Sequence, residues 1–251
     1  MRRAGLAVIA MSFALLAPSG TTAAQTIVRP LPHLVHHGMG TAQSTNWSGY
    51  AAYNTTFSVV KGSWIQPTAR CPNAVPTYSS FWVGLDGYKS SSVEQIGTDA
   101  DCQGTNSPNH YAWWEMYPNP SNPIAGFAVK PGDSITAQVS HLATVYTLTI
   151  RNNTTGQSYT TTQIAAAANS SAEWVAEAPS GCILIICTVL PLTNFGTVTF
   201  TGSSATSGTA KTISGYTNDS ITMTNQIGQV RAVPSGLNPD GSGFSVVWKR
   251  S

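Results

Sequence analysis

Two glutamates in one short stretch are the first residues of this sequence that could transfer protons. Residues 171–177 contain Glu173 and Glu177, although the whole chain has only 10 Asp and Glu in 251 residues. Read as a strand, the stretch places both glutamates on one face and Trp174 on the other. Carboxylates beside apolar side chains are costly to desolvate, so we consider them candidate acid–base groups. Taken alone, a half-exposed strand with solvated carboxylates is the simpler interpretation.

Two earlier stretches, residues 81–87 and 111–118, alternate in the same way and favour the interpretation of these glutamates as acid–base groups. The side chains expected on their outer faces are Trp82 and Asp86 from the first stretch and Tyr111, Trp113, Glu115 and Tyr117 from the second. Outward-facing tryptophans are costly unless something binds to them. If the three strands are neighbours, their outer faces form one aromatic, acidic groove.

The sequence lacks the motifs of serine hydrolases, zinc hydrolases and pepsin-like aspartic proteases. The sequence has no Gly-x-Ser-x-Gly, no His-Glu-x-x-His and no paired Asp-Thr/Ser-Gly loops, and beyond residue 43 its only histidines are His110 and His141. Charged residues make up 9% of the chain and form no basic stripe, which argues against a nucleic-acid partner. Carboxyl chemistry therefore remains, and we expect no metal and no cofactor.

The elements that must position these residues are short strands. Short strand-like stretches, such as residues 47–53, 134–139 and 145–150, are separated by turns; the last two alternate, and many of the stretches are rich in Thr and Val. This pattern predicts an all-β fold, a sandwich of two antiparallel sheets like the concanavalin-type jelly roll, as a single domain over residues 44–251. Only Gln163–Ala168 could be helical.

The N-terminal region has the features of a secretory signal. Arg2 and Arg3 precede an apolar run that is too short to span a bilayer comfortably, and small residues follow near Ala24. We therefore expect a signal peptide over residues 1–24, a leader or short propeptide over residues 25–43, and a secreted monomer that does not associate with membranes.

Four cysteines in an exported chain predict disulfides. Three pairings are possible. We favour Cys71–Cys102 and Cys182–Cys187, because each pair closes a local loop.

Five linked motifs carry a resemblance to a known family. They are Asn46-Trp47-Ser48-Gly49, Trp82-Val83-Gly84-Leu85-Asp86-Gly87, Glu94-Gln95-Ile96-Gly97, Tyr111-Ala112-Trp113-Trp114-Glu115-Met116-Tyr117-Pro118 and Ala172-Glu173-Trp174-Val175-Ala176-Glu177. Together they resemble the glutamic peptidase (eqolisin) family. The resemblance implies a two-sheet sandwich, a catalytic dyad of Gln95 and Glu177, and metal-independent cleavage of proteins or peptides in acid.

The resemblance also assigns substrate-binding residues. The positions that would line the substrate cleft are Trp47, Trp82, Asp86, Trp113, Glu115 and Tyr117. Cys182 follows the catalytic strand as a family cysteine does, which supports its pairing with Cys187. In two respects the sequence departs from the fungal members: Tyr111 stands where they can carry an acid, and the leader is short, as expected for a bacterial-type branch.

Two rival functions use the same side chains. A secreted jelly-roll glycoside hydrolase would use Glu115 and Glu177 as its acid and nucleophile, with Trp82 and Trp113 stacking on sugar rings. In a non-catalytic sugar-binding module the same aromatic residues would bind the sugar and the acids would only form hydrogen bonds. Only peptide hydrolysis gives Gln95 a special role, namely donating to the oxyanion while Glu177 activates water. We further expect Gln95 and Glu177 to face solvent or substrate, and activity to peak in acid.

Overall fold

The computed structural model describes residues 42–72, 75–104, 107–183 and 186–251. The predicted signal peptide over residues 1–24 lies outside the described residues, as does nearly all of the predicted leader over residues 25–43. The only helical element in the described ranges is η1 (Ile213–Gly215), a single 3-10 turn. No helix there has the length and the apolar character that crossing a membrane requires.

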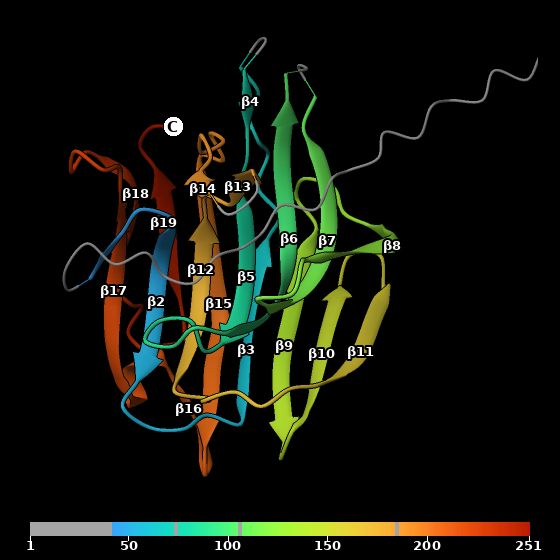
Figure 1. Cartoon of the computed structure of the whole chain (residues 1–251), viewed down its shortest axis with the longest axis vertical. Helices are drawn as coiled ribbons and strands as arrows, with labels where there is room; N and C mark the ends of the chain where they lie inside the picture. The colour runs from blue at the N-terminus through green and yellow to red at the C-terminus, as the bar shows by residue number, and fades with distance from the viewer. Residues whose placement is uncertain (1–41, 73–74, 105–106, 184–185) are drawn as a thin grey trace, which may run out of the picture.

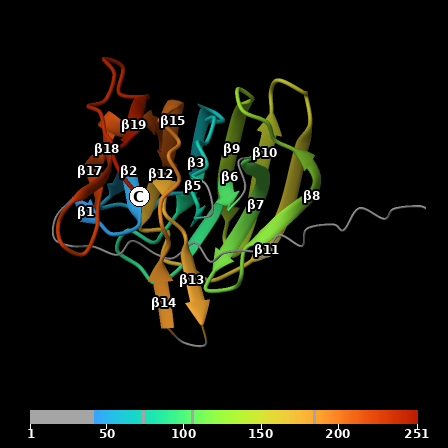
Figure 2. The ribbon, with the colours of Figure 1, turned by 90° about the horizontal axis from the view of Figure 1, so that it is seen from above.

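Two antiparallel sheets lie face to face (Figures 1 and 2). In the order of their pairing, the strands of sheet I are β17 (Thr217–Thr224), β2 (Trp47–Tyr53), β12 (Ser171–Glu177), β5 (Ser80–Leu85), β6 (Val93–Gln103), β7 (Asn109–Tyr117) and β8 (Asn122–Ala128). The strands of sheet II are β18 (Val230–Pro234), β19 (Phe244–Trp248), β15 (Thr197–Ser207), β3 (Val59–Ile65), β9 (Ser134–Leu142), β10 (Val145–Asn152) and β11 (Ser158–Ile164). The predicted two-sheet sandwich is confirmed.

Shorter strands complete the two sheets. They are β1 (Gln43–Ser44) beside β17, β4 (Pro76–Thr77) beside β6, and β16 (Thr209–Thr212) beside β15. Strand β18 pairs with β17 as well as with β19, so it joins sheet I to sheet II at one edge. The hairpin of β13 (Ser180–Ile183) and β14 (Ile186–Val189) directly follows β12 and projects away from the two layers on the side of sheet I (Figure 2).

The main core lies between the sheets and follows from the alternation of the strands. Phe81, Val83 and Leu85 of β5 point into it, together with Trp174 of β12, and all four are fully buried. The intervening residues of these strands point to the opposite face of sheet I, as the sequence predicted.

A second cluster, which we call the outer cluster, covers that opposite face. Its buried members are Trp47, Ala51, Trp82, Tyr88, Val93, Trp113, Val175 and Ile221. The rings of Trp47 and Trp82 pack edge to face with their centroids 4.9 Å apart. Trp82 and Trp113 lie on the predicted face, but the expectation that they are exposed there is wrong, since both are 0% exposed.

The suggested helix over Gln163–Ala168 is wrong, because the β10–β11 pairing continues through Ile164 and residues 165–170 are not helical.

Of the two predicted disulfides, Cys71–Cys102 is confirmed. The backbone of Cys182 lies opposite Cys187 in the β13–β14 hairpin, and Cys187 is disulfide-bonded. The side chain of Cys182 lies outside the described part of the structure, so its pairing stays a prediction.

Candidate active site

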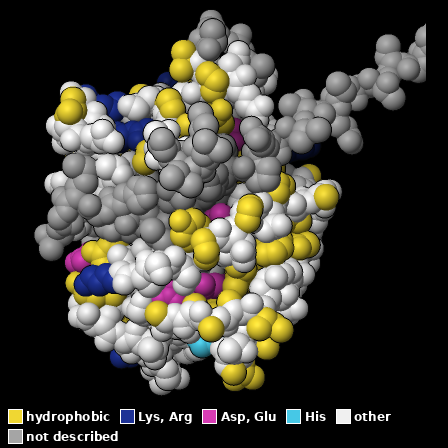
Figure 3. Space-filling view, in the orientation of Figure 1, with side chains coloured by type: hydrophobic (Ala, Val, Ile, Leu, Met, Phe, Trp, Pro, Cys, Tyr) yellow, Lys and Arg dark blue, Asp and Glu magenta, His cyan; other side chains and the backbone are white. Residues whose placement is uncertain are grey.

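Three rows of residues cross the outer face of sheet I, each taking one residue from β12, β5, β6 and β7. The Gln95 row is Glu173, Gly84, Gln95 and Glu115; the tryptophan row is Val175, Trp82, Gly97 and Trp113; the Glu177 row is Glu177, Ser80, Asp99 and Tyr111. Residues directly opposite each other in an antiparallel pair share a face, so each row is a continuous line of neighbours. Figure 3 views the molecule from this side, where some Asp and Glu side chains are visible next to hydrophobic ones. The acids of the three rows are themselves fully buried.

Glu177 is held by two N–H donors. The indole Nε1 of Trp82 donates to Oε2 at 2.8 Å, and Nδ2 of Asn46 donates to Oε1 at 3.5 Å. Asn46 is itself fixed, because its side chain accepts a hydrogen bond from Ser44 and its backbone carbonyl accepts one from the N–H of Ala178. The carboxylate of Glu177 therefore has one preferred orientation on the sheet.

Gln95 is oriented by a neighbouring acid. Its Nε2 donates to Oε2 of Glu115 at 2.7 Å, directly across the β6–β7 pair. Both side chains are fully buried. A primary amide has two N–H bonds, so this contact orients the group while using only one of them.

The glycines of the rows make room for Trp82. A Cβ on Gly84 would lie 3.0 Å from Cζ3 of the indole and 3.1 Å from Cβ of Gln95. At the other side of the same indole, Nε1 reaches Glu177. The ring of Trp82 therefore lies along the sheet between the Gln95 row and Glu177, and glycine at position 84 permits this close approach.

The carboxylate of Asp99 accepts a hydrogen bond from the second tryptophan of the tryptophan row. Nε1 of Trp113 donates to Oδ1 of Asp99 at 2.5 Å, so both tryptophans of the middle row donate to carboxylates of the Glu177 row. The hydroxyl of Tyr111 lies 2.7 Å from Oδ2 of Asp99 and 3.0 Å from Oδ2 of Asp101.

This hydroxyl links two buried carboxyl groups through shared protons. A tyrosine has one hydroxyl hydrogen and can donate to only one of them, so the other contact needs a proton on the second carboxyl. Burial, followed by the charge of Asp99, raises the pKa of Asp101 well above its usual value, which favours the protonated form of the Asp101 carboxyl. Burial also raises the pKa of Tyr111, and the two nearby carboxylates raise it further.

Glu173 lies level with Gln95, across Gly84. It is fully buried, and neither carboxylate oxygen has a partner at hydrogen-bond geometry among the described residues. Burial, and to a smaller extent the charges of Asp86 and Glu94, raises its pKa well above the usual value. Glu173 is therefore expected to be neutral in acid.

The carboxylate of Asp86 accepts hydrogen bonds from the residues that precede β12. Its carboxylate accepts hydrogen bonds from the backbone N–H of Asn169 at 2.5 Å, the backbone N–H of Ser170 at 2.8 Å and the hydroxyls of Ser170 and Ser90. These contacts anchor the segment that leads into β12. Asp86 therefore holds the residues before β12, and its predicted part in substrate binding stays a prediction.

The remaining predicted site residues belong to the outer cluster or its margin. Trp47 lies opposite Glu177 in the β2–β12 pair, and Tyr117 is partly buried against the cluster at the end of β7. Gln95 and Glu177 share the outer face as predicted, and both are 0% exposed. Of the expectation that they face solvent or substrate, the part concerning substrate stays a prediction. Among the described residues, no three His, Cys, Asp or Glu side chains are grouped so that they could hold a metal ion.

Sequence reasoning missed three contributors to this site: Asn46 as a donor to Glu177, and the pair Asp99 and Asp101. The signal for the pair was present, because Gln95, Asp99 and Asp101 recur at even spacing along β6 and therefore share a face. The contact of Asn46 depends on a turn between β1 and β2 that no periodicity describes.

Known proteins resemble this chain in sequence and in fold. Aspergillopepsin-2 from Aspergillus niger is 28% identical over 190 residues, which are 66% of this chain and 65% of that protein. Scytalidopepsin B from Scytalidium lignicola is 30% identical over 175 residues, which are 65% of this chain and 64% of that protein. The chain thus matches just under two thirds of the length of each of these relatives.

Among solved structures, scytalido-glutamic peptidase with a transition state analog inhibitor superimposes with a TM-score of 0.70. That match covers 82% of this chain and 98% of that chain at 24% sequence identity, and it establishes the shared fold. The sequence pattern of the Peptidase A4 family matches residues 45–240, most of the described chain. The resemblance to the glutamic peptidases is thereby confirmed, and the chain belongs to the Peptidase A4 family.

Proposed function

We propose that this protein is a secreted endopeptidase that hydrolyses peptide bonds of proteins or peptides in acid, with Gln95 and Glu177 as its catalytic groups and without a metal. The observation that carries the proposal is the carboxylate of Glu177, oriented by Trp82 and Asn46 on the same sheet face as Gln95. Membership of the Peptidase A4 family supports it.

The proposed reaction uses one water and two side chains. The carboxylate of Glu177 takes a proton from the water, and the water oxygen attacks the peptide carbonyl carbon. The oxyanion that forms accepts an N–H bond of Gln95, whose second N–H is oriented by Glu115. Glu177, now protonated, gives its proton to the leaving nitrogen as the C–N bond breaks, which regenerates the carboxylate and releases an acid and an amine.

Glutamine suits the oxyanion role because it stays neutral at every pH. A second carboxylate in its place would oppose the build-up of negative charge on the substrate oxygen. In this proposal Glu115 is a positioning residue, because it orients the amide of Gln95. A glycoside hydrolase would instead need Glu115 as a free acid or base, and its carboxylate accepts the bond from Gln95 at 2.7 Å.

The test compares a protein substrate with two polysaccharides and measures how the rate of cleavage depends on pH. The purified protein is incubated at acid pH with an unfolded protein, with xylan and with β-glucan, in the presence of pepstatin and a chelator. Proteolysis without sugar release supports the proposal. Sugar release alone, a rate maximum at or above neutral pH, or loss of proteolysis with the chelator would reject it.

Two matched variants separate the glutamates of β12. Glu177→Gln is expected to lower kcat by at least roughly 10²-fold, the usual minimum contribution of a positioned acid–base group. Glu173→Gln makes the same substitution on the same strand face, at a glutamate that is expected to be neutral in acid, and is expected to have a much smaller effect. Because Glu173 lies level with Gln95, the reverse result would assign the catalytic role to Glu173 instead. Gln95→Ala is expected to reduce kcat by roughly 10²–10³-fold, as loss of an oxyanion donor does.

A further inference from the structure

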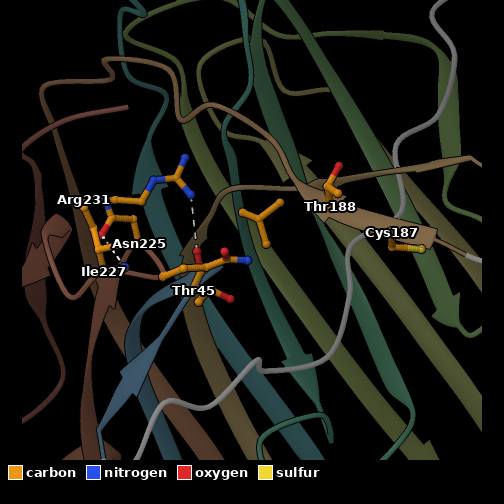
Figure 4. A pocket seen from close by; sticks show the side chains of 8 residues that line it. Thr45, Cys187, Thr188, Asn225, Ile227 and Arg231 are labelled. Carbon is orange, nitrogen blue, oxygen red and sulfur yellow. Dashed lines mark hydrogen bonds between the residues drawn. The ribbon is translucent and has the colours of Figure 1, made fainter.

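A pocket of about 540 Å³ lies beside the candidate active site (Figure 4). Its walls come from the β13–β14 hairpin, the turn between β17 and β18, and the segment before β2. The residues that line it are Thr45, Cys187, Thr188, Val189, Asn225, Gln226, Ile227 and Arg231. Neither the peptide-hydrolysis proposal nor the outer cluster uses any of these side chains.

Arg231 supplies the only charge among these lining residues. The side chain is 6% exposed, and its donors Nη1 and Nη2 contact the backbone carbonyls of Thr45 at 3.3 Å and Leu190 at 2.7 Å. A guanidinium has five N–H bonds, so these two contacts leave donors to spare. Burial lowers the pKa of Arg231 to about 10, which keeps the group charged in acid and at neutral pH.

None of the described residues that line the pocket is acidic, so no carboxylate among them balances this charge. The other polar lining side chains are neutral, and Ile227, 79% exposed, adds an apolar surface. The backbone N–H groups of Lys249 and Arg250 donate to the carbonyl of Arg231, which brings the backbone of two further basic residues close to that of Arg231 in space. A partly desolvated cation with open donors favours an anionic group, and a planar guanidinium matches a carboxylate.

The pocket and Glu177 are connected through short contacts. Thr45, whose carbonyl accepts from Arg231, precedes Asn46, and Asn46 donates to Glu177. On the other wall, Leu190, which also accepts from Arg231, hydrogen-bonds the carbonyl of Pro179, two residues after Glu177. The carbonyls that Arg231 contacts are thus one or two hydrogen bonds away from residues that hold or closely follow Glu177.

We propose that this pocket is a substrate subsite that binds a carboxylate group of the peptide through Arg231. The ligand is an acidic side chain or a C-terminal carboxylate a few residues from the scissile bond, with the side-chain methylenes against Ile227 and Val189. The inference rests on the proposed peptidase function and adds a specificity to it. Both kinds of carboxylate are largely or partly ionised near pH 4, where the enzyme is proposed to act.

The experiment measures kcat/KM near pH 4 for a set of matched peptides. A neutral peptide is compared with versions that carry Glu or its isostere Gln at each position around the scissile bond, and with a version whose C-terminus is an acid or an amide. We expect Glu to be preferred over Gln by roughly tenfold at one position, as for a hydrogen-bonded charge. A preference for the terminal acid over the amide would identify the other source of the carboxylate.

Three variants locate the preference. Arg231→Gln is expected to abolish it. Arg231 also donates to two backbone carbonyls, so this variant could fail to fold. Thr188→Glu is therefore a second test, because it adds a negative charge at an exposed residue of the lining. This variant is expected to cancel or reverse the preference for the acidic peptide. Thr162→Glu, on exposed β11 of sheet II, changes the net charge equally and is expected to retain the preference.

The outcomes separate the two proposals. If the wild-type protein cleaves the neutral peptide but treats Glu and Gln alike at every position, and acid and amide alike, the subsite is rejected and the peptidase function stands. An acid preference that survives Thr188→Glu unchanged also rejects the subsite. If no peptide of the set and no unfolded protein is cleaved, the peptidase function itself fails.

Discussion

The indole of Trp82 on β5 donates a 2.8 Å hydrogen bond to Oε2 of Glu177 on β12, and both residues are fully buried. These residues are 95 positions apart in the sequence. The register brings them together because β5 pairs with β12 and because Gly84 leaves space for the far edge of the ring. The same indole therefore packs in the outer cluster and orients the proposed catalytic acid.

Removing this donor alone tests its role. Trp82→Phe keeps an aromatic ring and loses the N–H, so we expect kcat to fall roughly 10–100-fold, the usual range for a hydrogen bond to a charged group. Steady-state kinetics on a peptide substrate measures the change. The matched control is Trp64→Phe, in which a buried indole loses its 3.0 Å bond to Thr98 between the sheets. Equal losses of kcat in both variants would contradict a specific role for Trp82.

The stability of the fold is expected to fall as the pH rises from about 4.5 toward 8. Burial, and then the charge of Asp86, raises the pKa of Glu94 to about 8, and Glu173 is shifted in the same direction. Below the pKa that the glutamate has in the unfolded protein, both the folded and the unfolded state hold its proton. Above it the unfolded state loses the proton first, so the free energy of unfolding decreases until the folded pKa is passed. Glu94 alone accounts for a change on the order of a few kcal/mol.

Thermal melts at several pH values measure this effect. Glu94→Gln is expected to flatten the decline, because a neutral amide does not titrate. Asp240→Asn is the control: Asp240 is fully exposed and its pKa is lowered by Ser242, so its loss is expected to leave this pH window unchanged. A melting temperature that rises from pH 4.5 to pH 8 would contradict the prediction.

Tyr111→Phe is expected to destabilise the fold by about 1–3 kcal/mol, because it leaves the buried carboxyls of Asp99 and Asp101 without their shared hydroxyl. The loss should be greater at pH 7 than at pH 4, since a buried carboxyl that has lost one of its hydrogen-bond donors is costlier when ionised. Denaturant unfolding at the two pH values measures it. Tyr50→Phe, which removes a hydroxyl bonded to the neutral carbonyl of Ser235, should show no such difference between the two pH values.

Gly97→Ala is expected to disturb the tryptophan row. A Cβ at this position would lie 2.5 Å from Cβ of Trp82 and would also overlap the carbonyl of Phe81. Such overpacking typically costs about 1–3 kcal/mol, and here it would also displace the indole that orients Glu177. Melting temperature and kcat should therefore fall together. Gly236→Ala, with no atom within 4 Å of the added Cβ, is the control, and matching losses there would show that the effect is not local.

Much of the site was predictable because it depends on local alternation. Period-two patterns in residues 81–87, 111–118 and 171–177 assigned Trp82, Trp113 and Glu177 to the face away from the core, and the structure agrees. The five spaced motifs identified the family. The same pattern along β6 assigns Asp99 and Asp101 to this face, although the prediction did not include them.

Other features depend on contacts between distant segments, which periodicity does not contain. That β12 pairs with β2 and β5, rather than with its neighbours in the sequence, is decided by burial of both faces of sheet I. Whether Trp82 is exposed depends on the rings that pack against it, and whether Asp86 contacts a ligand depends on the backbone N–H groups of Asn169 and Ser170. The alternation of single strands was determined by the sequence itself, because side-chain direction in a strand is a local property. The partners of each carboxylate were decided by the tertiary structure, because hydrogen bonds at 2.5–3.5 Å require strands far apart in the chain to be placed side by side.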